Sequence, residues 1–322
     1  MANPQQAVFL SGDLMRHVVR MSLTSSIGLM AMFAVDFVDM IFMAMLGNSE
    51  LAAAVGYAGT LLFFTNSVNI GLSIAAGSLV SRSLGAGMAA DGRRYATNVG
   101  IFSLLTGVAL AALVLIYQNA ILGWLGAEGE VQRLAGRYVS IILPTMVAMG
   151  LAMTAMAVLR AYGDARRSML ATLYGGAVNA VLDPLFIFGL GWGLDGAAIA
   201  SVIARLVMLA LSLGPAIRVH DAFGRPHIAP LTSDFRVIGA IALPAVLANI
   251  ATPVGNAIVT REIARFGTDA VAGITVIGRL MPVAFAVIFA LSGRSSGRTS
   301  APAGSTACAR PLRPGCALPP FT

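Results

Sequence analysis

Five polar residues interrupt long apolar stretches of this chain: Asp36, Asp39, Asn179, Asp183 and Ser201. The three aspartates are the only ones of the 14 acidic residues inside such stretches, where an ionisable group is costly and usually functional. In helices, Asp36 and Asp39 share one face, as do Asn179 and Asp183. Carboxylate, amide and hydroxyl oxygens suit a hard cation such as Na⁺, and two nearby carboxylates could equally share a proton. The residue types therefore predict a Na⁺ or proton site.

The spacing also predicts a common depth for this site. At about 1.5 Å per residue, Asp39 and Asp183 each lie about 10 Å from the outer ends of their helices, and Ser201 is five residues into the next helix. Asp36 is the weaker candidate, because it could equally face a loop or a water-filled crevice. Taken singly, Asn179 and Ser201 could be ordinary polar residues within a bundle. Pro184 is expected to kink its helix next to the site.

The composition identifies the surroundings that must hold these residues. The 322 residues are 57% hydrophobic and 11% charged, with a mean hydropathy of +0.83, whereas soluble domains have about 25% charged residues. The net charge of +7 does not indicate a soluble nucleic-acid-binding protein, because the chain has too few charged residues for that class. The two cysteines, Cys308 and Cys316, leave the body of the chain without a cysteine metal site or disulfide framework. We predict an integral membrane protein.

Eight apolar stretches reach the length of about 20 residues that a spanning helix needs. They are Met21–Leu46, Leu51–Val80, Tyr95–Tyr117, Tyr138–Leu159, Ser168–Gly189, Gly196–Gly214, Val237–Thr260 and Ala270–Leu291. Backbone groups in hydrocarbon must bond within their own segment, so these stretches are helices. The prediction is an all-α integral membrane protein of about eight transmembrane helices, with a complete six-helix first lobe and the first two helices of a parallel second repeat.

Arginine placement predicts the orientation. With the N-terminus in the cytoplasm, the inner segments hold eleven arginines and the outer loops four. The positive-inside rule therefore favours a multi-pass protein of the cell inner membrane with a cytoplasmic N-terminus. Arg205 and Arg279 fall within spans, and we expect them to reach toward an interface rather than pair with a carboxylate.

A weak repeat at an offset of 220 residues suggests the domain organisation. Leu46-Gly47 and Leu51-Ala52 recur as Phe266-Gly267 and Val271-Ala272. The predicted parts are a first lobe (1–214), a cytoplasmic inter-lobe linker (215–236), a partial second lobe (237–291) and a disordered tail (292–322). An equal second lobe would end near roughly residue 434. We therefore expect a truncated chain whose tail is out of frame.

Several motifs resemble those of the multidrug and toxic compound extrusion (MATE) transporters. Val38-Asp39-Met40-Ile41-Phe42, followed by Leu46-Gly47 and Leu51-Ala52-Ala53, is similar to the family's first-helix signature. A second group of motifs is similar to its helices 4 to 6: Arg160-Ala161-Tyr162-Gly163-Asp164, Asn179, Asp183-Pro184-Leu185 and Gly196-Ala197-Ala198. The resemblance covers about residues 10–291. Two departures are Thr24, where bacterial members often have a proline, and Val259, which stands opposite Asp39 at the 220-residue offset.

The resemblance implies twelve helices in two lobes and export of organic cations in exchange for Na⁺ or H⁺. It implies a cation site at Asp39 and Asp183, with Asn179 and Ser201 as neighbours and Asp36 as a weaker member. Na⁺, held by Asp39, Asn179 and Asp183, would be the only metal. The expected partners are small organic cations or drugs and the lipid bilayer, with no cofactor and no nucleic acid. The full-length protein is expected to be a monomer.

The sequence thus predicts a cation-coupled multidrug antiporter that is inactive at the present length. One alternative is a lipid-linked oligosaccharide flippase of related architecture, which would need a cationic cavity for a pyrophosphate. Another is an intramembrane aspartyl hydrolase in which Asp39 and Asp183 activate water. No nucleophile–base constellation stands out, so we do not expect an enzyme. The identity of the substrate and the choice between Na⁺ and H⁺ stay open.

Overall fold

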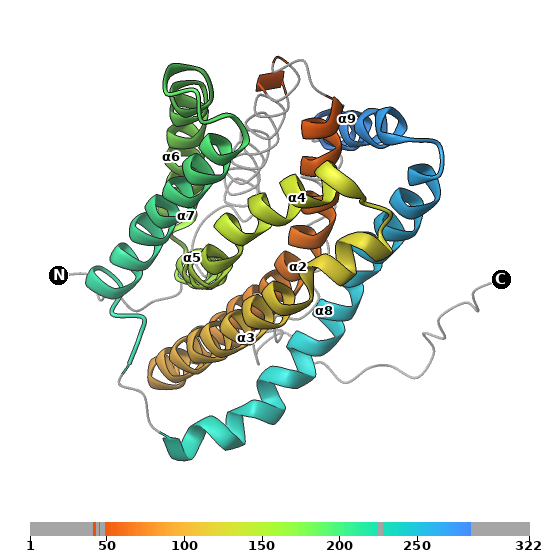
Figure 1. Ribbon diagram of the computed structural model, residues 1–322. Coiled ribbons are helices and arrows are strands. Elements are labelled where there is room, and N and C mark those ends of the chain that lie inside the picture. Colours follow the sequence, from red (N-terminus) through yellow and green to blue (C-terminus); the bar gives the residue numbers. More distant parts are fainter. Residues whose placement is uncertain (1–40, 43–44, 46–48, 225–227, 285–322) are drawn as a thin grey trace, which may run out of the picture.

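The computed structural model describes residues 41–42, 45, 49–224 and 228–284, and every regular element within them is a helix (Figure 1). The α-helices are α2 (Ser49–Gly85), α3 (Ala89–Trp124), α4 (Gly129–Ile142), α5 (Met146–Ala161), α6 (Ala165–Pro184), α7 (Gly193–Arg218), α8 (Ile228–Ala264) and α9 (Thr268–Ala284). A 3₁₀ turn, η1 (Leu143–Thr145), joins α4 to α5, and a π-helical turn, η2 (Leu185–Gly189), follows α6. The predicted all-α fold is confirmed.

Six helical segments in the described part of the chain are long and apolar enough to cross a membrane. They are Ser49–Gly85, Ala89–Trp124, Gly129–Ala161, Ala165–Gly189, Gly193–Arg218 and Asp234–Ala264. They correspond to the second through seventh predicted spans, and α9 occupies the position of the eighth. The first predicted span lies almost wholly outside the described residues, so the total of eight stays a prediction.

Successive helices turn at alternate ends of the bundle. The turns after α2, α5 and α7 lie at one end, with Arg82, Arg93, Arg94, Arg160, Arg166, Arg167 and Arg218 close by. We call this the arginine-rich end. The turns after α3, η2 and α8 lie at the opposite end. Gly163, with φ of 84°, reverses the chain at the first end, and Gly126, with φ of 95°, does so at the second, because glycine enters the left-handed region without strain.

Small residues let α2 occupy the centre of the bundle. This helix packs against α3, α5 and α8, and Ala53, Ala58 and Ala76 on it are fully buried. At Gly71, an added Cβ would lie 2.3 Å from Cγ2 and 2.8 Å from the backbone nitrogen of Val246 on α8. Such close backbone approach through glycine and alanine is typical of packing between membrane helices.

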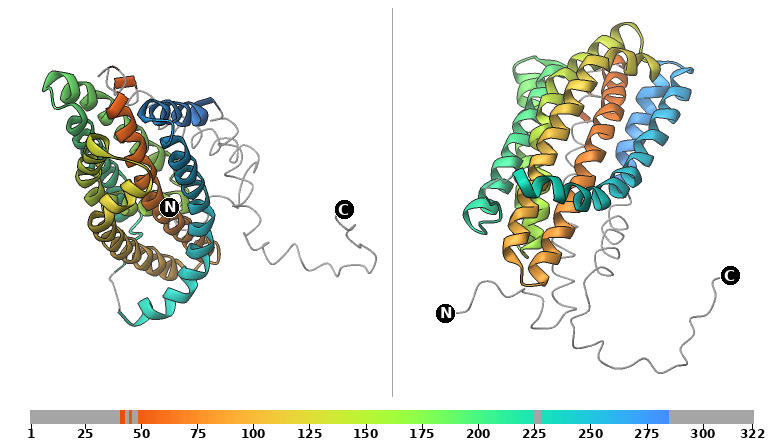
Figure 2. Two further views of the ribbon diagram at one scale, coloured as in Figure 1. Left: turned by 45° about the vertical axis from the view of Figure 1, so that its right-hand side comes forward. Right: turned by 90° about the horizontal axis from the view of Figure 1, so that it is seen from below.

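Prolines interrupt or bend the long segments. Pro144 lies in η1, where the third described span changes from α4 to α5. Pro244 and Pro253 lie inside α8, and this helix first runs across the bundle and then turns to run along it (Figure 2, right). A proline within a helix removes a backbone hydrogen bond and crowds the preceding turn, which accounts for such bends.

The segment between α7 and α8 is short. Helix α7 continues to Arg218 and α8 begins at Ile228, so both helices extend into the range 215–236 predicted as a linker. Residues Val219–Gly224, which we call the strap, lie outside the helices. The strap packs onto the bundle, because its Ala222 is fully buried. The predicted tail (292–322) lies outside the described residues.

Candidate functional site

Asn179 and Asp183 form a buried polar pair on α6. They lie one helical turn apart, and Nδ2 of Asn179 donates a hydrogen bond of 2.5 Å to Oδ2 of Asp183. Asp183 is 1% exposed and Asn179 is 7% exposed. The predicted shared face therefore exists, and it is buried. A carboxylate in this position carries a large desolvation penalty unless it binds a proton, a cation or other polar groups.

The backbone changes from α-helix to π-helix directly beyond this pair. Helix α6 ends at Pro184, and in η2 the Leu190 nitrogen donates to the Leu185 carbonyl at 2.9 Å. The predicted disturbance at Pro184 thus takes the form of a π-helical turn. Turns of this kind are frequent at functional sites, because they displace backbone groups from the regular ladder.

Ser201 lies on the neighbouring helix α7, which packs along α6. Its side chain is half-buried. Helix α7 can begin close to η2 because position 196 is glycine: an added Cβ there would lie 2.8 Å from the backbone carbon of Phe186. The fold therefore places Ser201 on an element next to the Asn179–Asp183 pair, and its part in ion binding stays a prediction.

Arg205, one turn beyond Ser201, does not follow the expectation that it reaches toward an interface. Its Nη1 donates to the Ile142 carbonyl at 3.4 Å and to the Thr145 hydroxyl at 3.3 Å. The helix break at Pro144 offers these oxygens to a donor, since the α-helical ladder is interrupted there. A guanidinium on α7 is thus bound to a backbone and a hydroxyl oxygen of the segment that joins α4 to α5. The side chain of Arg279 lies outside the described residues.

The other two predicted carboxylates, Asp36 and Asp39, lie outside the described residues. Within the part of the chain that the structure describes, no group of three or more His, Cys, Asp or Glu side chains is arranged to hold a metal ion. Asn179 and Asp183 thus supply an incomplete set of oxygen ligands. Hard cations take about six oxygens, so further ligands must come from other residues, backbone carbonyls or water.

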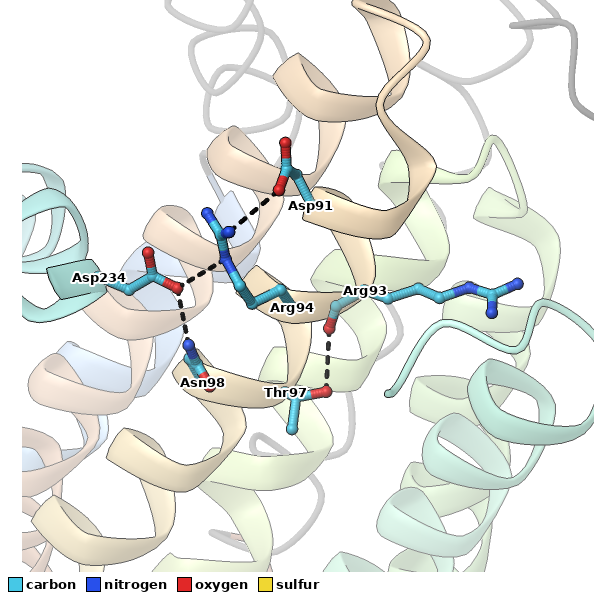
Figure 3. A network of polar contacts seen from close by, with 6 residues as sticks. All are labelled: Asp91, Arg93, Arg94, Thr97, Asn98 and Asp234. Carbon is cyan, nitrogen blue, oxygen red and sulfur yellow. Dashed lines mark hydrogen bonds and ion pairs between the residues drawn. The ribbon is translucent and has the colours of Figure 1, made fainter. Parts of the chain in front are cut away.

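A second buried carboxylate, Asp234 on α8, lies at the arginine-rich end and was not among the predicted site residues. Its Oδ2 accepts hydrogen bonds from Nδ2 of Asn98 at 2.7 Å and from Nε of Arg94 at 3.0 Å (Figure 3). Nη1 of Arg94 also pairs with Oδ1 of Asp91 at 3.1 Å. Asp234 is 3% exposed. The sequence placed Asp234 in the linker, and only the spacing of Asp91, Arg94 and Asn98 on one helix face signals this network.

The comparisons with known proteins agree with the resemblance. A family model described as MatE matches residues 25–185. A FAD transporter of Shewanella oneidensis is 28% identical over 289 residues, which are 88% of this chain and 64% of the relative. The multidrug export protein MepA of Staphylococcus aureus is 24% identical over 305 residues, covering 90% of this chain and 65% of MepA. The chain thus spans a little under two thirds of the length of these curated relatives.

Solved structures of transporters share the fold. The outward-facing conformation of a multidrug resistance MATE family transporter of the MOP superfamily superposes with a TM-score of 0.78 and 25% identity, covering 92% of this chain and 66% of that one. The inward-facing conformation of such a transporter gives a TM-score of 0.72 and 25% identity, over 81% of this chain and 60% of that one. From the family match over half of its length and these shared folds, the chain belongs to the MatE family of membrane transporters.

Proposed function

We propose that this protein exports small organic molecules across the inner membrane in exchange for a cation, and that Asn179 and Asp183 belong to the cation site. The observation that carries the proposal is a nearly fully buried carboxylate bonded to an amide on one face of α6. An ionised group at that depth is expensive. A bound Na⁺ or proton lowers the free-energy cost of burying this carboxylate, so binding of the cation is favourable at this pair.

Coupling follows if cation and substrate favour different conformations. A ligand shifts a conformational equilibrium only by the difference between its affinities for the two states. Coupling between the two sites is then reciprocal. We place the cation at Asp183 and Asn179, with Asp39, Ser201 and, less strongly, Asp36 as further ligands. The arginine-rich end is assigned to the cytoplasm, because loops on that side are enriched in arginine.

The proposed substrates are small organic cations, as the family resemblance implies, and the relative MepA is by its name a multidrug export protein. A second candidate is a flavin dinucleotide, because the Shewanella oneidensis relative is a FAD transporter. These relatives are transporters of drugs or FAD, so neither an oligosaccharide flippase nor an intramembrane hydrolase is favoured.

The cation site can be tested by thermal unfolding of the purified chain in detergent. Increasing NaCl at constant ionic strength, balanced with potassium chloride, is expected to raise the Tm, and a pH series tests whether protons replace Na⁺. Asp183→Asn is expected to remove this response. Asp269→Asn is the matched control, because Asp269 is an exposed aspartate in the first turn of α9. An unchanged response in Asp183→Asn would refute the assignment.

The substrate class can be tested on the same preparation. Ethidium represents the organic cations and FAD the dinucleotides, and fluorescence polarisation of each reports binding. We expect ethidium to bind and Na⁺ to weaken its binding, since coupling is reciprocal. If FAD binds and ethidium does not, the proposed substrate class changes from organic cations to flavin dinucleotides. Binding of neither compound would contradict both substrate assignments.

A further inference from the structure

We propose that Asp91, Arg94 and Asn98 on α3, with Asp234 on α8, form a latch that closes the arginine-rich end and must open before α8 can move away from the first lobe. The movement would serve the proposed transport, so its purpose rests on that function. The existence of the latch rests on the contacts themselves, which join residues 136 and 140 positions apart in the sequence.

One face of α3 is built for this contact. Asp91, Arg94, Asn98 and Phe102 are spaced by three or four residues, so they form a single stripe along the helix. Arg94 and Asn98 bind Asp234, and one turn further the ring of Phe102 packs against Phe235 with 5.6 Å between ring centroids. The two helices therefore meet through polar groups near the start of α3 and through aromatic rings one turn further along it.

The electrostatics of the latch suit a contact that can open. The Asp234 side chain is 4% exposed, whereas that of Arg94 is 38% exposed. The carboxylate is thus held away from solvent by its partners, while the guanidinium keeps much of its contact with the surroundings. When the helices part, Asp234 regains solvation and Arg94 can still pair with Asp91 on its own helix. Opening therefore leaves no charge buried without a partner, which is the costly outcome for such pairs.

The strap is fixed to the same end of the bundle at three successive points. Nε2 of His220 contacts Oδ2 of Asp164 at 2.9 Å. Nη1 of Arg93 pairs with Oδ2 of Asp221 at 2.7 Å, and its side chain points away from Asp234 (Figure 3). The hydroxyl of Thr97 accepts a hydrogen bond of 2.9 Å from the Gly224 nitrogen. Because Arg93, Arg94, Thr97 and Asn98 alternate between strap and α8, the first turns of α3 bind both segments.

The contact between α2 and α8 at Gly71 supplies a pivot for the movement. Val246 lies against Gly71 with no room for a Cβ, and the hydroxyl of Ser67 donates to the Asn249 carbonyl at 3.2 Å. Pro244 precedes this contact by two residues, and the bend in α8 separates the latched part from the part along α2 (Figure 2). Release of Asp234 would free the first part of α8 while the contact at Gly71 holds.

The part of α8 that follows Asp234 buries apolar side chains against α2 and α3, and these provide a reporter. Ile238 is 3% exposed and lies one turn beyond Asp234. We would introduce Ile238→Cys in a background with Cys308→Ser and Cys316→Ser, and measure its maleimide labelling rate in the purified full chain. Asp234→Asn and Arg94→Gln are each expected to accelerate labelling about tenfold, which corresponds to about 1.4 kcal/mol.

Two controls separate opening of the latch from general loss of structure. Arg133→Gln removes an exposed ion pair with Glu130 at the opposite end and is expected to leave labelling unchanged. A second reporter, Val139→Cys, lies at a fully buried position of α4 and is expected to stay slow in every variant. Equal acceleration of both reporters, acceleration by Arg133→Gln, or no acceleration by Asp234→Asn would each overturn the latch. Labelling requires no transport, so its outcome is independent of the cation test at Asp183.

Discussion

The two buried carboxylates, Asp183 and Asp234, use the same kind of partner in different ways. Each accepts a short hydrogen bond from an asparagine amide, at 2.5 Å for Asp183 and 2.7 Å for Asp234. Asn179 and Asp183 belong to one helix, so their bond survives any rigid movement of α6. Asn98 and Asp234 belong to different helices, so their bond breaks when α3 and α8 part. A local pair can hold an ion throughout a movement, whereas a distant pair can control whether the movement occurs.

The largest expected effect separates the two carboxylates by their response to cations. At a Na⁺ concentration of 100 times Kd, binding to the folded state adds about 2.7 kcal/mol of stability. Asp183→Asn is expected to abolish this increment, whereas Asp234→Asn is expected to keep it. Thermal unfolding with and without Na⁺ measures both. The proposed division of roles fails if Asp234→Asn, and not Asp183→Asn, loses the increment.

The next effect concerns stability without added cations. Asp234→Ala leaves Asn98 and Arg94 without their shared acceptor, and we expect a loss of about 2–3 kcal/mol in the free energy of unfolding, since a buried pair that loses one partner is costly but Arg94 keeps solvent contact. Denaturant unfolding followed by tryptophan fluorescence measures the loss.

A double-mutant cycle isolates the ion pair within this effect. Arg94→Gln, Asp234→Asn and the double variant are expected to give a coupling energy of about 1 kcal/mol, since the pair is only partly buried. A coupling energy near zero would show that Asn98 alone holds Asp234.

The difference between the two carboxylates also explains which parts of the fold and of the site can be predicted from the sequence. The second to seventh spans and the Asn179–Asp183 face follow from local patterns, namely long apolar stretches and a spacing of four residues. The sequence alone predicts a linker position for Asp234, because a charged residue next to a helix end is expected to be solvated unless a helix distant in the sequence covers it. The contact of Arg205 with the break at Pro144 was missed for the same reason. Local periodicity predicts which residues share one face of a helix. It does not predict which other helix packs against that face.

A separate substitution tests the proposed pivot. Gly71→Ala would place a Cβ 2.8 Å from the Val246 nitrogen. Because that backbone atom cannot move aside as a flexible side chain would, we expect a loss of about 1–3 kcal/mol, typical of overpacking. Gly255→Ala is the matched control on α8, where an added Cβ meets no atom of the described residues within 4 Å. It is expected to be neutral or stabilising by up to about 1 kcal/mol, since alanine favours helices. Equal effects of the two substitutions would argue against a close contact at Gly71.

The smallest effect concerns Asp164, a carboxylate outside the spans that anchors the strap. Burial by itself raises the pKa of Asp164, but the His220 ring and the Arg167 backbone and side chain outweigh it, and the pKa lies below its ordinary value. Asp164 therefore contributes stability that is present above the unfolded-state pKa of about 3.9 and is lost as the pH falls through the lower folded value. Asp164→Asn keeps an acceptor at the N-terminus of α6, where asparagine also caps well, so its effect isolates the charge.

For Asp164→Asn we expect a loss of about 1 kcal/mol at pH 7, typical of partly buried charged hydrogen bonds. The difference from the unsubstituted chain should shrink as the pH falls below about 4, because the aspartate is then becoming protonated. Denaturant unfolding at pH 7 and at acidic pH checks both statements. Asp164→Ala removes the cap as well, and it is expected to cost about 1 kcal/mol more at both pH values. A deficit of Asp164→Asn that stays constant with pH would show that shape and hydrogen bonding, rather than charge, fix the strap to the turn between α5 and α6.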